Sequence, residues 1–588
     1  MLQNLIFPKK GICEEAELYF HIRMGKAVLQ EEGLFLEQGT IVDFFSYFNS
    51  FSAGKWWEYT TVREVEAVLI CHGRCRISLY RTRLRPERGV LYTEKVAEGA
   101  DKVRFWCDSP EWIYYFEAEA QEDILICGGG YQANAPLKNR VVNLAIGICT
   151  YRREEYVQRT IRNLSDHILQ NLESGLCGHV HIFVSDNGGT LSKEKLNNEF
   201  VHVVSNKNAG GAGGFGRCML ETMKVQERCG FTHILLMDDD IILEPEAVFR
   251  TWQMLSLLKE EYRGHLLGGG LLRLDIPYIQ HENSAQWQGD RIIFPKQGYD
   301  LSERYAVVAN EERKPVNYCG WWYCCIPIAE RFEHALPMPF FIHRDDIEYG
   351  LRYRGRIITL NGISVWHDAF DHRRASSMVY YDIRNALICN AIHYPEYSAK
   401  DAKKYVIKNM FGHLMKYRYE DQKLTLRALE DFCRGTAFLS SRDPVGLHQE
   451  IMAMGYKQTD VSCVLEECHV EDYYIRPEPK DLYKRTGSSL VNVILLNGWF
   501  LPGKRKCIPI PFGAPHKEFF RCKRVLLFDP DSKQGFLVER KWRQFFVTIG
   551  RCLTAWCIIR KCYKKAAGDW RENGRKLTTR EFWERYLE

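Results

Sequence analysis

Three consecutive aspartates form the most obvious group of chemically active side chains in the sequence. Asp238, Asp239 and Asp240 stand between two apolar runs, residues 233–237 and 241–243. Because side chains alternate along an extended chain, Asp238 and Asp240 should point to one side and Asp239 to the other. Two carboxylates on one side suit Mg²⁺ or Mn²⁺, but aspartates are also frequent in solvated turns. The triplet by itself leaves both interpretations open.

A glycine-rich segment, NKNAGGAGGFGRCM, precedes the triplet at residues 206–219. It follows a strand-like run and leads into an apolar helical run, so its backbone N–H groups can approach a phosphate or a sugar closely. It is not a Walker loop, because no Gly-Lys-Ser/Thr follows it. The alternative is a tight turn with close helix packing.

A second acidic pair, Asp345 and Asp346, opens the helical run in PFFIHRDDIEYGLRYRG. Acidic residues at the start of a helix often serve only to stabilise it, because their negative charge interacts favourably with the positive end of the helix dipole. In a protein that already has a metal-type triplet, a catalytic base is the other interpretation. His367 follows the strand-like run ISVW. A single histidine is usually structural, but imidazole also suits Mn²⁺ and would complete a site begun by two aspartates.

The elements that must position these residues begin near Arg140. Near-continuous apolar runs at residues 141–150, 179–186, 200–205 and 232–237 alternate with helical or loop stretches. Runs without alternation indicate strands buried on both faces, hence a mostly parallel α/β sheet. Ligands bind such sheets at the carboxyl ends of the strands. The polar residues that follow each run are therefore expected at one edge.

The flanking segments have other patterns. From about Tyr19 to Gly128, short runs rich in aromatic and β-branched residues predict antiparallel strands in a β-sandwich. This segment is either a packing and oligomerisation module, which would make the chain a homo-oligomer, or a glycan-binding module. After about Ser376 the apolar spacing becomes helical. The predicted domains are residues 1–135, 136–375, 376–478 and 479–588.

A basic and aromatic stretch lies in the last of these segments. Residues 540–565 contain eight lysines and arginines and no acid, framing Trp, Phe and Ile side chains. Such a stretch suits an anionic membrane surface. The alternative is a helix whose apolar face completes the core.

Bulk composition excludes some classes of protein. At 588 residues the chain is too long for one hydrophobic core. Lys plus Arg number 80 and Asp plus Glu 75, a balance that argues against a dedicated nucleic-acid binder. No stretch offers the roughly 18 apolar residues of a membrane span. The 21 scattered cysteines suggest reduced thiols. We therefore expect a cytoplasmic protein, at most peripheral on the inner face of the cell membrane.

Five motifs together resemble a known family. MDDDI, NxNxGGxGGF, GWWYCCIP, DD-x-E-YGLR and VWH together look like the GT-A glycosyltransferases of family 2. Within that family they are most similar to the bacterial galactofuranosyltransferases that build cell-wall galactan. The resemblance covers most of the chain, including the N-terminal β segment. It implies a multidomain α/β protein with a GT-A, Rossmann-like core and a helical C-terminal region.

The resemblance also implies roles for the donor side. Asp238, Asp240 and His367 would hold Mn²⁺ or Mg²⁺, which would bridge the diphosphate of a UDP-sugar. The other implied donor contacts are the residues that follow strand-like runs, with Asp239 on the ribose or sugar: Thr150, Arg152, Asp186, Asn208 and Asp239.

On the acceptor side, Asp346 would be the general base for an inverting displacement. Trp321 and Trp322 would form the acceptor platform, with Asp345 and His281 beside it. Glu282 is a weaker candidate for a contact with either substrate. The implied reaction transfers galactofuranose from UDP-galactofuranose to a hydroxyl of a lipid-linked cell-surface glycan.

Two departures from the family pattern leave the acceptor open. Arg344 stands where an aromatic residue is usual, and charged residues follow His367 at Asp368 and residues 371–374. The alternatives to the main hypothesis are the same chemistry with another donor, for instance rhamnosyl transfer, and a non-catalytic glycan-binding scaffold. A nucleotidyltransferase would need a glycine-rich basic loop near the start of the chain, and none is present.

Overall fold

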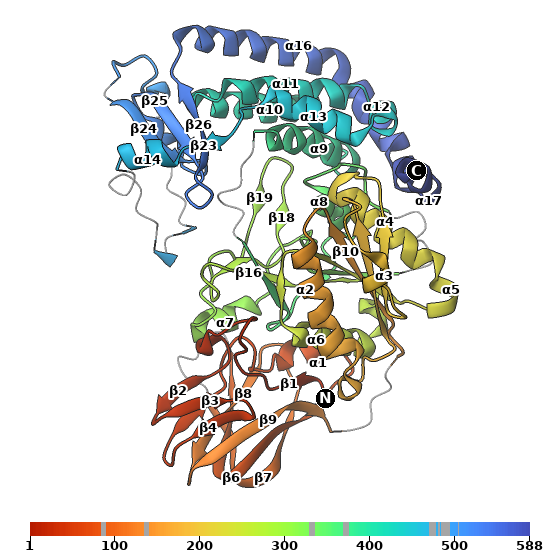
Figure 1. Ribbon diagram of the computed structural model, residues 1–588, viewed down its shortest axis with the longest axis vertical. Helices are drawn as coiled ribbons and strands as arrows, with labels where there is room; N and C mark the ends of the chain where they lie inside the picture. Colours follow the sequence, from red (N-terminus) through yellow and green to blue (C-terminus); the bar gives the residue numbers. More distant parts are fainter. Residues whose placement is uncertain are drawn as a thin grey trace.

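The computed structural model describes residues 1–83, 90–134, 140–328, 336–368, 376–469, 478–479, 482–483, 494–503 and 505–588. Residues 371–374 of the charged run after His367 lie outside this part of the chain. The molecule is elongated, with a β region at one end, an α/β region in the middle and helices at the other end (Figure 1). This arrangement is the predicted mixed α/β, multidomain architecture with a helical C-terminal region.

The N-terminal region is one nine-stranded antiparallel sheet. Its strands are β1 (Gln3–Asn4), β2 (His21–Met24), β3 (Ala27–Gln30), β4 (Gly33–Leu36), β5 (Ile41–Asp43), β6 (Glu64–Thr82), β7 (Val90–Trp106), β8 (Ile113–Ala120) and β9 (Ile124–Ala133). The two halves of this sheet fold over each other: β6 pairs with β9 along its first half and with β8 along its second, and the rings of Phe116 in β8 and Tyr131 in β9 lie 6.2 Å apart between their centres. Helix α1 (Ala53–Tyr59) follows β5.

The central sheet has the order β12-β11-β10-β13-β20-β15-β21. Its strands are β10 (Leu144–Thr150), β11 (Val180–Asp186), β12 (Val201–Ser205), β13 (His233–Asp238), β15 (Leu266–Gly268), β20 (Cys324–Pro327) and β21 (Ile357–Ile358). The first four strands of that order are parallel, as their buried apolar runs predict, and β20 pairs antiparallel with β13. The polar residues after these strands consequently share one edge.

Helices flank this sheet, and a smaller sheet lies beside it. The helices are α2 (Glu154–Leu164), α3 (Lys193–Leu196), α4 (Gly210–Lys224), α5 (Gln226–Cys229), α6 (Pro245–Leu257), α7 (Arg304–Asn310) and α8 (Asp345–Leu351). The smaller sheet contains β14 (Ile242–Leu243), β22 (Ser364–His367), β16 (Gly270–Arg273) and β17 (Gln280–Glu282), and a hairpin joins β18 (Gln286–Trp287) to β19 (Ile292–Ile293). Because Ile242 pairs with Trp366, the end of β22 lies beside the aspartate triplet.

The helical region follows the smaller sheet. It comprises α9 (Met378–His393), α10 (Ala399–Met415), α11 (Tyr419–Cys433), α12 (Thr436–Ser441), α13 (Pro444–Met454) and α14 (Ser462–Glu467). A further sheet has the order β23 (Thr459–Asp460), β26 (Gln534–Glu539), β25 (Cys522–Phe528) and β24 (Arg505–Pro511). The chain ends in α16 (Trp542–Asn573) and α17 (Arg580–Leu587).

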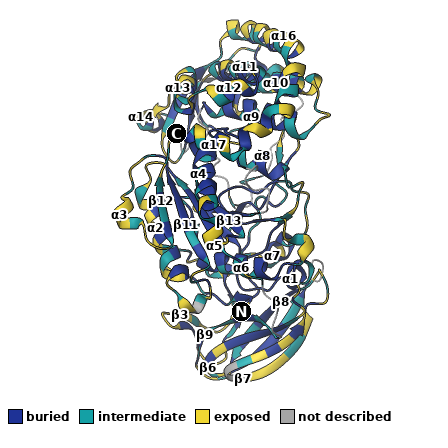
Figure 2. Cartoon of the chain, turned by 90° about the vertical axis from the view of Figure 1, so that its right-hand side faces the viewer, coloured by how far each residue is buried: buried dark blue, intermediate teal, exposed yellow. Residues whose placement is uncertain are grey.

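Helix α16 is the predicted basic and aromatic stretch, and it lies along the outer edge of the helical region (Figure 1). One face is buried against α9, α10 and α11, through residues such as Cys552, Ala555 and Ile559. The opposite side is exposed (Figure 2). Within the described part of the chain, no helix combines the length and apolar content that crossing a membrane requires.

Candidate active site

Two strand ends bring the predicted metal ligands together. Asp238 is the last residue of β13 and His367 the last of β22. Ligand atoms of Asp238, Asp240 and His367 all lie within 4.8 Å of one another. His367 Nε2 is 3.0 Å from Asp240 Oδ1, and its Nδ1 is 2.5 Å from the carbonyl oxygen of Asp368, which fixes the ring orientation. A histidine held through its other nitrogen is the usual arrangement of a metal ligand.

The charges of this cluster fit a divalent cation. Burial raises the pKa of Asp238 to about 7; the charge of His367 opposes this rise and those of Asp240 and Asp239 add to it. Burial also disfavours the charged form of Asp240, but its hydrogen bond with His367 lowers the pKa to about 2. Two carboxylates and an imidazole are ligands that Mn²⁺ and Mg²⁺ accept. A divalent cation at this position would offset the repulsion between the buried aspartate carboxylates.

The arginine that reaches the triplet is Arg153, which the sequence did not single out. Its Nη1 lies 2.5 Å from Asp240 Oδ2 and 3.2 Å from Asp239 Oδ1. Arg152, the predicted donor contact, is exposed, and its guanidinium lies 5.3 Å from the centre of the Tyr151 ring. The backbone of Arg152 is in the left-handed region, with a φ of 55°. Two adjacent arginines gave no sequence signal for which one faces inward.

The other predicted donor residues lie at the same sheet edge. Thr150 pairs in register with Asp186, and Cys149 with Asp238. Both side-chain oxygens of Asp186 accept backbone N–H groups, from Gly188, Gly189 and Leu191 at 2.9–3.0 Å, so this carboxylate holds its own turn.

The glycine-rich segment forms the start of α4 and packs against the second acidic pair. Asn208 Oδ1 accepts the N–H of Gly210 at 3.1 Å. Gly210 has a φ of 70°, and a Cβ there would lie 1.9 Å from the carbonyl oxygen of Phe341. A Cβ on Gly211 would lie 3.7 Å from Asp345 Oδ2. Glycine is therefore needed for the close approach of this loop to the segment that carries Asp345 and Asp346.

Asp345 and Asp346 begin α8 after a strained loop. Phe341, His343 and Arg344 have φ values of 74°, 63° and 68°, a conformation that costs non-glycine residues free energy. Strain of this kind persists where the surrounding structure holds it, often at functional sites. Burial raises the pKa of both carboxyls, and for Asp345 the charge of Asp346 adds to the rise.

Arg344 supports this loop through two contacts. Its guanidinium stacks over Trp287 at 4.5 Å from the ring centre, and its Nη2 lies 3.3 Å from Asp382 Oδ1. His343 Nδ1 lies 3.1 Å from the same oxygen. The residue that departs from the family pattern thus fixes the acidic pair against α9, from which Asp382 projects.

Glu348 anchors the same helix. Its carboxylate is buried, 2.5 Å from Arg352 Nη2 and 2.8 Å from His393 Nε2. Burial disfavours the charged form, but Arg352 and His393 together lower the pKa of Glu348 to about 2. The glutamate of the DD-x-E motif therefore ties α8 to α9 and does not face a substrate.

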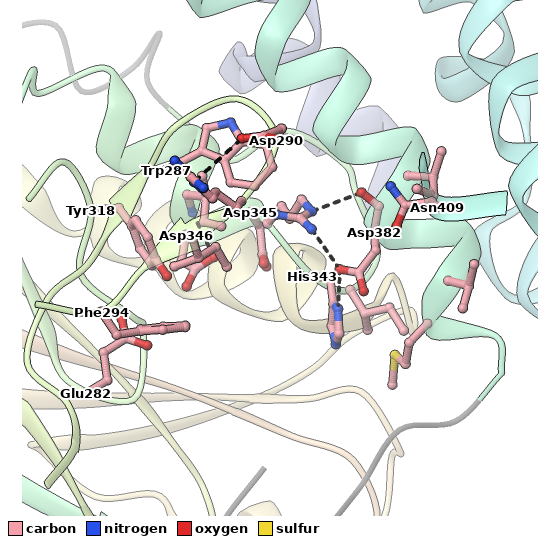
Figure 3. Close-up of a pocket in the computed structure, with 18 of the residues that line it drawn as sticks. Glu282, Trp287, Asp290, Phe294, Tyr318, His343, Asp345, Asp346, Asp382 and Asn409 are labelled. Carbon is pink, nitrogen blue, oxygen red and sulfur yellow. Dashed lines mark hydrogen bonds and ion pairs between the residues drawn. The ribbon is translucent and has the colours of Figure 1, made fainter. Parts of the chain in front are cut away.

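A cavity of about 1040 Å³ joins the two acidic groups. Asp238 and Gly211 line it, and so do Asp345, Asp346 and Glu282. Figure 3 shows Asp345 and Asp346 between Glu282 and Phe294 on one side and Asp382 on the other. The buried Glu282 carboxyl has a pKa raised well above its usual range, by burial and then by the charge of Asp346.

The predicted acceptor residues also line this cavity. Trp321 and Trp322 are only 5% and 8% exposed. Trp321 packs edge-on against Phe215 and Tyr349, and Trp322 Nε1 donates to the carbonyl of Gly269 at 3.1 Å. These contacts leave only a rim of each ring toward the cavity. His281 Nδ1 lies 2.7 Å from the Tyr483 hydroxyl.

Three further aromatic residues of the cavity wall lie close to the acidic pair, and no sequence motif singles them out. They are Trp287, Phe294 and Tyr318. All three are brought in by the β18–β19 hairpin and its neighbouring loops, which no local motif predicts.

Comparison with known proteins gives related sequences. Residues 2–134 match the family model described as Galactofuranosyltransferase 2 N-terminal. Galactofuranosyltransferase GlfT2 of Mycobacterium tuberculosis (strain ATCC 25618 / H37Rv) is 28% identical over 437 residues, which cover 68% of this chain and 66% of the relative. The protein of the same name from Mycolicibacterium smegmatis (strain ATCC 700084 / mc(2)155) is 28% identical over 436 residues, 68% and 65% of the two chains. The chain spans just under two thirds of the length of these relatives.

Among solved structures, a mannosyltransferase from Pyrobaculum calidifontis in complex with GDP-Man and Mn²⁺ is similar at 11% identity, over 58% of this chain and 90% of that one. Its TM-score of 0.30 is too low to carry an argument. The sequence relatives are therefore the informative comparison. The match over residues 2–134 and the two sequence relatives confirm the predicted resemblance of the chain to bacterial galactofuranosyltransferases.

Proposed function

We propose that the chain is a metal-dependent inverting glycosyltransferase with a GT-A core, transferring galactofuranose from UDP-galactofuranose to a hydroxyl of a glycan. The observation that carries this proposal is that a metal-type cluster and a separate acidic pair line one cavity with aromatic walls. The similarity to galactofuranosyltransferases supports the transferred sugar. The parallel sheet with its aspartates at the carboxyl edge supports the GT-A assignment.

The donor end is the cluster at the end of β13. Asp238, Asp240 and His367 would hold Mn²⁺ or Mg²⁺, which when bound supplies Lewis-acid stabilisation of a leaving diphosphate. Asp239 and Arg153, paired at 3.2 Å, are the polar groups next to that cluster. Thr150, Arg152 and Asn208 complete the proposed nucleotide side at the same sheet edge. Asp186 shapes the turn between them.

The base is proposed to be Asp346. Its carboxylate takes the proton of the acceptor hydroxyl while that oxygen bonds to the anomeric carbon. The bond from this carbon to the UDP oxygen breaks, and UDP leaves with the electron pair. One displacement inverts the anomeric centre. Burial strengthens this base by raising its pKa above the usual range for aspartate.

The acceptor is proposed to lie against the aromatic wall. Sugar C–H faces pack on aromatic rings, and the rims of Trp321 and Trp322 meet the cavity together with Tyr318 and Phe294. His281 and Asp345 would supply polar contacts there. This placement sets an acceptor hydroxyl next to Asp346.

A donor panel tests the proposal. The protein is incubated with Mn²⁺, a galactofuranose disaccharide and one of UDP-galactofuranose, UDP-galactopyranose or dTDP-rhamnose, and the product is measured by mass. The proposal expects transfer from UDP-galactofuranose alone, and its loss with EDTA. Transfer from dTDP-rhamnose alone would overturn the donor. Binding of the disaccharide without transfer from any donor would favour the scaffold alternative.

An exposed stripe on α16 supports a peripheral membrane location, which we include in the proposal. It consists of large apolar side chains spaced by four and three residues, each 39–63% exposed: Trp542, Phe546, Ile549, Leu553 and Trp556. Arg543 and Lys541 flank its start, and Arg560, Lys561 and Lys564 continue it. Apolar side chains with basic neighbours suit an anionic bilayer surface, and this lipid surface is the occupant we propose.

Vesicle flotation tests this location. The wild-type chain is expected to float with vesicles of phosphatidylglycerol and phosphatidylcholine, less so at high salt. A variant with Trp542→Ser, Phe546→Ser and Leu553→Ser should stay behind. Leu172→Ser is the control, because Leu172 is 81% exposed and remote from α16. If the triple variant floats as well as wild type, the stripe is not the membrane-binding surface. If the wild-type chain is a dimer and the triple variant is a monomer, the stripe is instead a contact with a second copy of the chain.

A further inference from the structure

The cavity continues beyond the residues that the proposed reaction uses. Its outer part, which we call the outer chamber, lies between α10 and the short 3₁₀ helix His516–Phe519. It is lined by Asn409, Gly412, His413, Lys416 and His516. Figure 3 shows Asn409 on the far side of Asp382 from the acidic pair. A volume of about 1040 Å³ stands at the top of the roughly 300–1,000 Å³ typical of one drug-sized ligand.

The polar groups of the outer chamber have unused hydrogen-bonding capacity. His413 Nε2 and His516 Nδ1 are buried atoms without a hydrogen-bond partner among the described residues. Buried polar atoms normally have a hydrogen-bond partner, so atoms without one in the wall of a cavity indicate that a bound ligand supplies the partner. Burial lowers the pKa of both imidazoles to about 4. The charge of Asp421 acts in the opposite direction on the pKa of His413 but does not cancel the effect of burial.

Neutral imidazoles favour one class of ligand. Each offers one donor and one acceptor, as a sugar hydroxyl does, whereas an anionic phosphate would be matched by cations. The cations nearby are already engaged. Lys408 Nζ lies 3.4 Å from Asp290 Oδ2, Lys416 Nζ donates to the carbonyl of Ala514 at 2.7 Å, and Arg418 pairs with Asp421. The chamber therefore suits an uncharged polyhydroxy ligand better than a phosphate.

Gly412 keeps the chamber open. It lies inside α10, where glycine is less stable than alanine by about 1 kcal/mol, so the helix itself gives no reason for it. A Cβ at this position would lie 3.8 Å from His516 Cε1, in ordinary contact. Any larger side chain would fill the space between α10 and His516. The facing wall is fixed, because the Tyr417 hydroxyl donates to the carbonyl of Phe519 at 3.0 Å.

From these features we propose that the outer chamber is a subsite for the acceptor glycan, binding the sugars that lie beyond the one whose hydroxyl is attacked. The inference rests on the proposed glycosyltransferase function and adds a length preference to it. An acceptor long enough to reach from Asp346 past Asp382 to Asn409 gains contacts that a disaccharide lacks. The enzyme should consequently use longer galactofuranose oligomers with a higher kcat/KM.

Blocking the chamber tests the subsite. Gly412→Phe should lower kcat/KM about tenfold for a hexasaccharide acceptor, the equivalent of about 1.4 kcal/mol of lost binding. The same variant should leave kcat/KM for a disaccharide within about twofold. Gly412→Ala is the matched control, since its methyl group only touches His516 and should leave both acceptors unaffected. An equal loss for both acceptors, or no loss for either, would overturn the subsite.

A second variant guards against misfolding of Gly412→Phe. Asn409→Ala with His516→Ala removes polar groups and adds no volume, and the same loss for the long acceptor alone is expected. Failure of the subsite is distinguishable from failure of the proposed function. Wild-type transfer to both acceptors with equal kcat/KM contradicts only the subsite, whereas no transfer from UDP-galactofuranose to either contradicts both.

Discussion

The two acidic groups of the cavity differ in how their charge is compensated. At Asp238–Asp240, His367 and Arg153 face the carboxylates, and the pKa values of Asp238 and Asp240 are driven apart, to about 7 and about 2. At Asp345–Asp346, the neighbouring Arg344 and His343 turn to Asp382, and the pKa values of both carboxyls are raised. The difference teaches that one group is arranged to hold a cation and the other to hold a proton.

The largest effect is expected from Asp346→Asn. An amide cannot accept the acceptor proton, so turnover should fall about 10²–10⁴-fold, the usual contribution of a general base. The measurement is sugar transfer from UDP-galactofuranose at saturating donor. Asp166→Asn, an exposed aspartate remote from the cavity, is the control. Unchanged turnover in Asp346→Asn would remove the base from this pair.

Glu348→Gln should have the next largest effect, on stability. Breaking its buried pair with Arg352 and His393 should cost about 3–5 kcal/mol of unfolding free energy. Because the folded pKa of Glu348 is lowered, its contribution is present above the unfolded pKa and lost as pH falls toward about 2. Urea unfolding at pH 7 and pH 4 should therefore show a smaller difference from wild type at the lower pH. A pH-independent difference would contradict the ion pair.

His367→Ala should sharpen the comparison at the metal end. Loss of one ligand should weaken Mn²⁺ binding by at least about 10–100-fold, the range seen even for residues that only support ligands. Electron paramagnetic resonance of free Mn²⁺ measures this directly. His393→Ala is a useful contrast, because His393 pairs with Glu348 and should not change Mn²⁺ affinity. Equal Mn²⁺ binding by wild type and His367→Ala would break the cation assignment.

The smallest effect is expected from Arg153→Met. This arginine is 43% exposed, and a partly exposed ion pair contributes about 0–1 kcal/mol. Removing its positive charge leaves the carboxylates more negative, so Mn²⁺ affinity should rise slightly, by up to about fivefold. The same titration measures it, with Arg162→Met, a change of an exposed arginine in α2, as control. Weaker Mn²⁺ binding in Arg153→Met alone would mean that the arginine positions the ligands.

The sequence predicted that the residues following the strands of the central sheet lie at one edge, because strand periodicity is local. Buried runs ending in Thr150, Asp186 and Asp238 required a shared edge, and the structure places Thr150 opposite Asp186 and Cys149 opposite Asp238. The position of His367 beside the aspartates was predicted from the motif resemblance alone, because it depends on the pairing of β14 with β22. Local pattern cannot give that pairing.

The acceptor side was less predictable. Trp321 and Trp322 are more buried than a stacking platform needs, and the other rings of the wall, Phe294 and Tyr318, come from loops without a motif. Arg344 adopts a left-handed φ that no propensity favours, because its contacts with Trp287 and Asp382 hold it. Such residues are set by tertiary packing, which the sequence reveals only after the fold is known.

The division between a cation-holding and a proton-holding group is tested most directly by UDP titration calorimetry with and without Mn²⁺. Asp346→Asn should bind UDP with wild-type affinity and the same Mn²⁺ dependence, although its sugar transfer should fall about 10²–10⁴-fold. Asp240→Ala should lose the Mn²⁺-dependent part of UDP binding. Loss of that part in Asp346→Asn, or its retention in Asp240→Ala, would contradict the account.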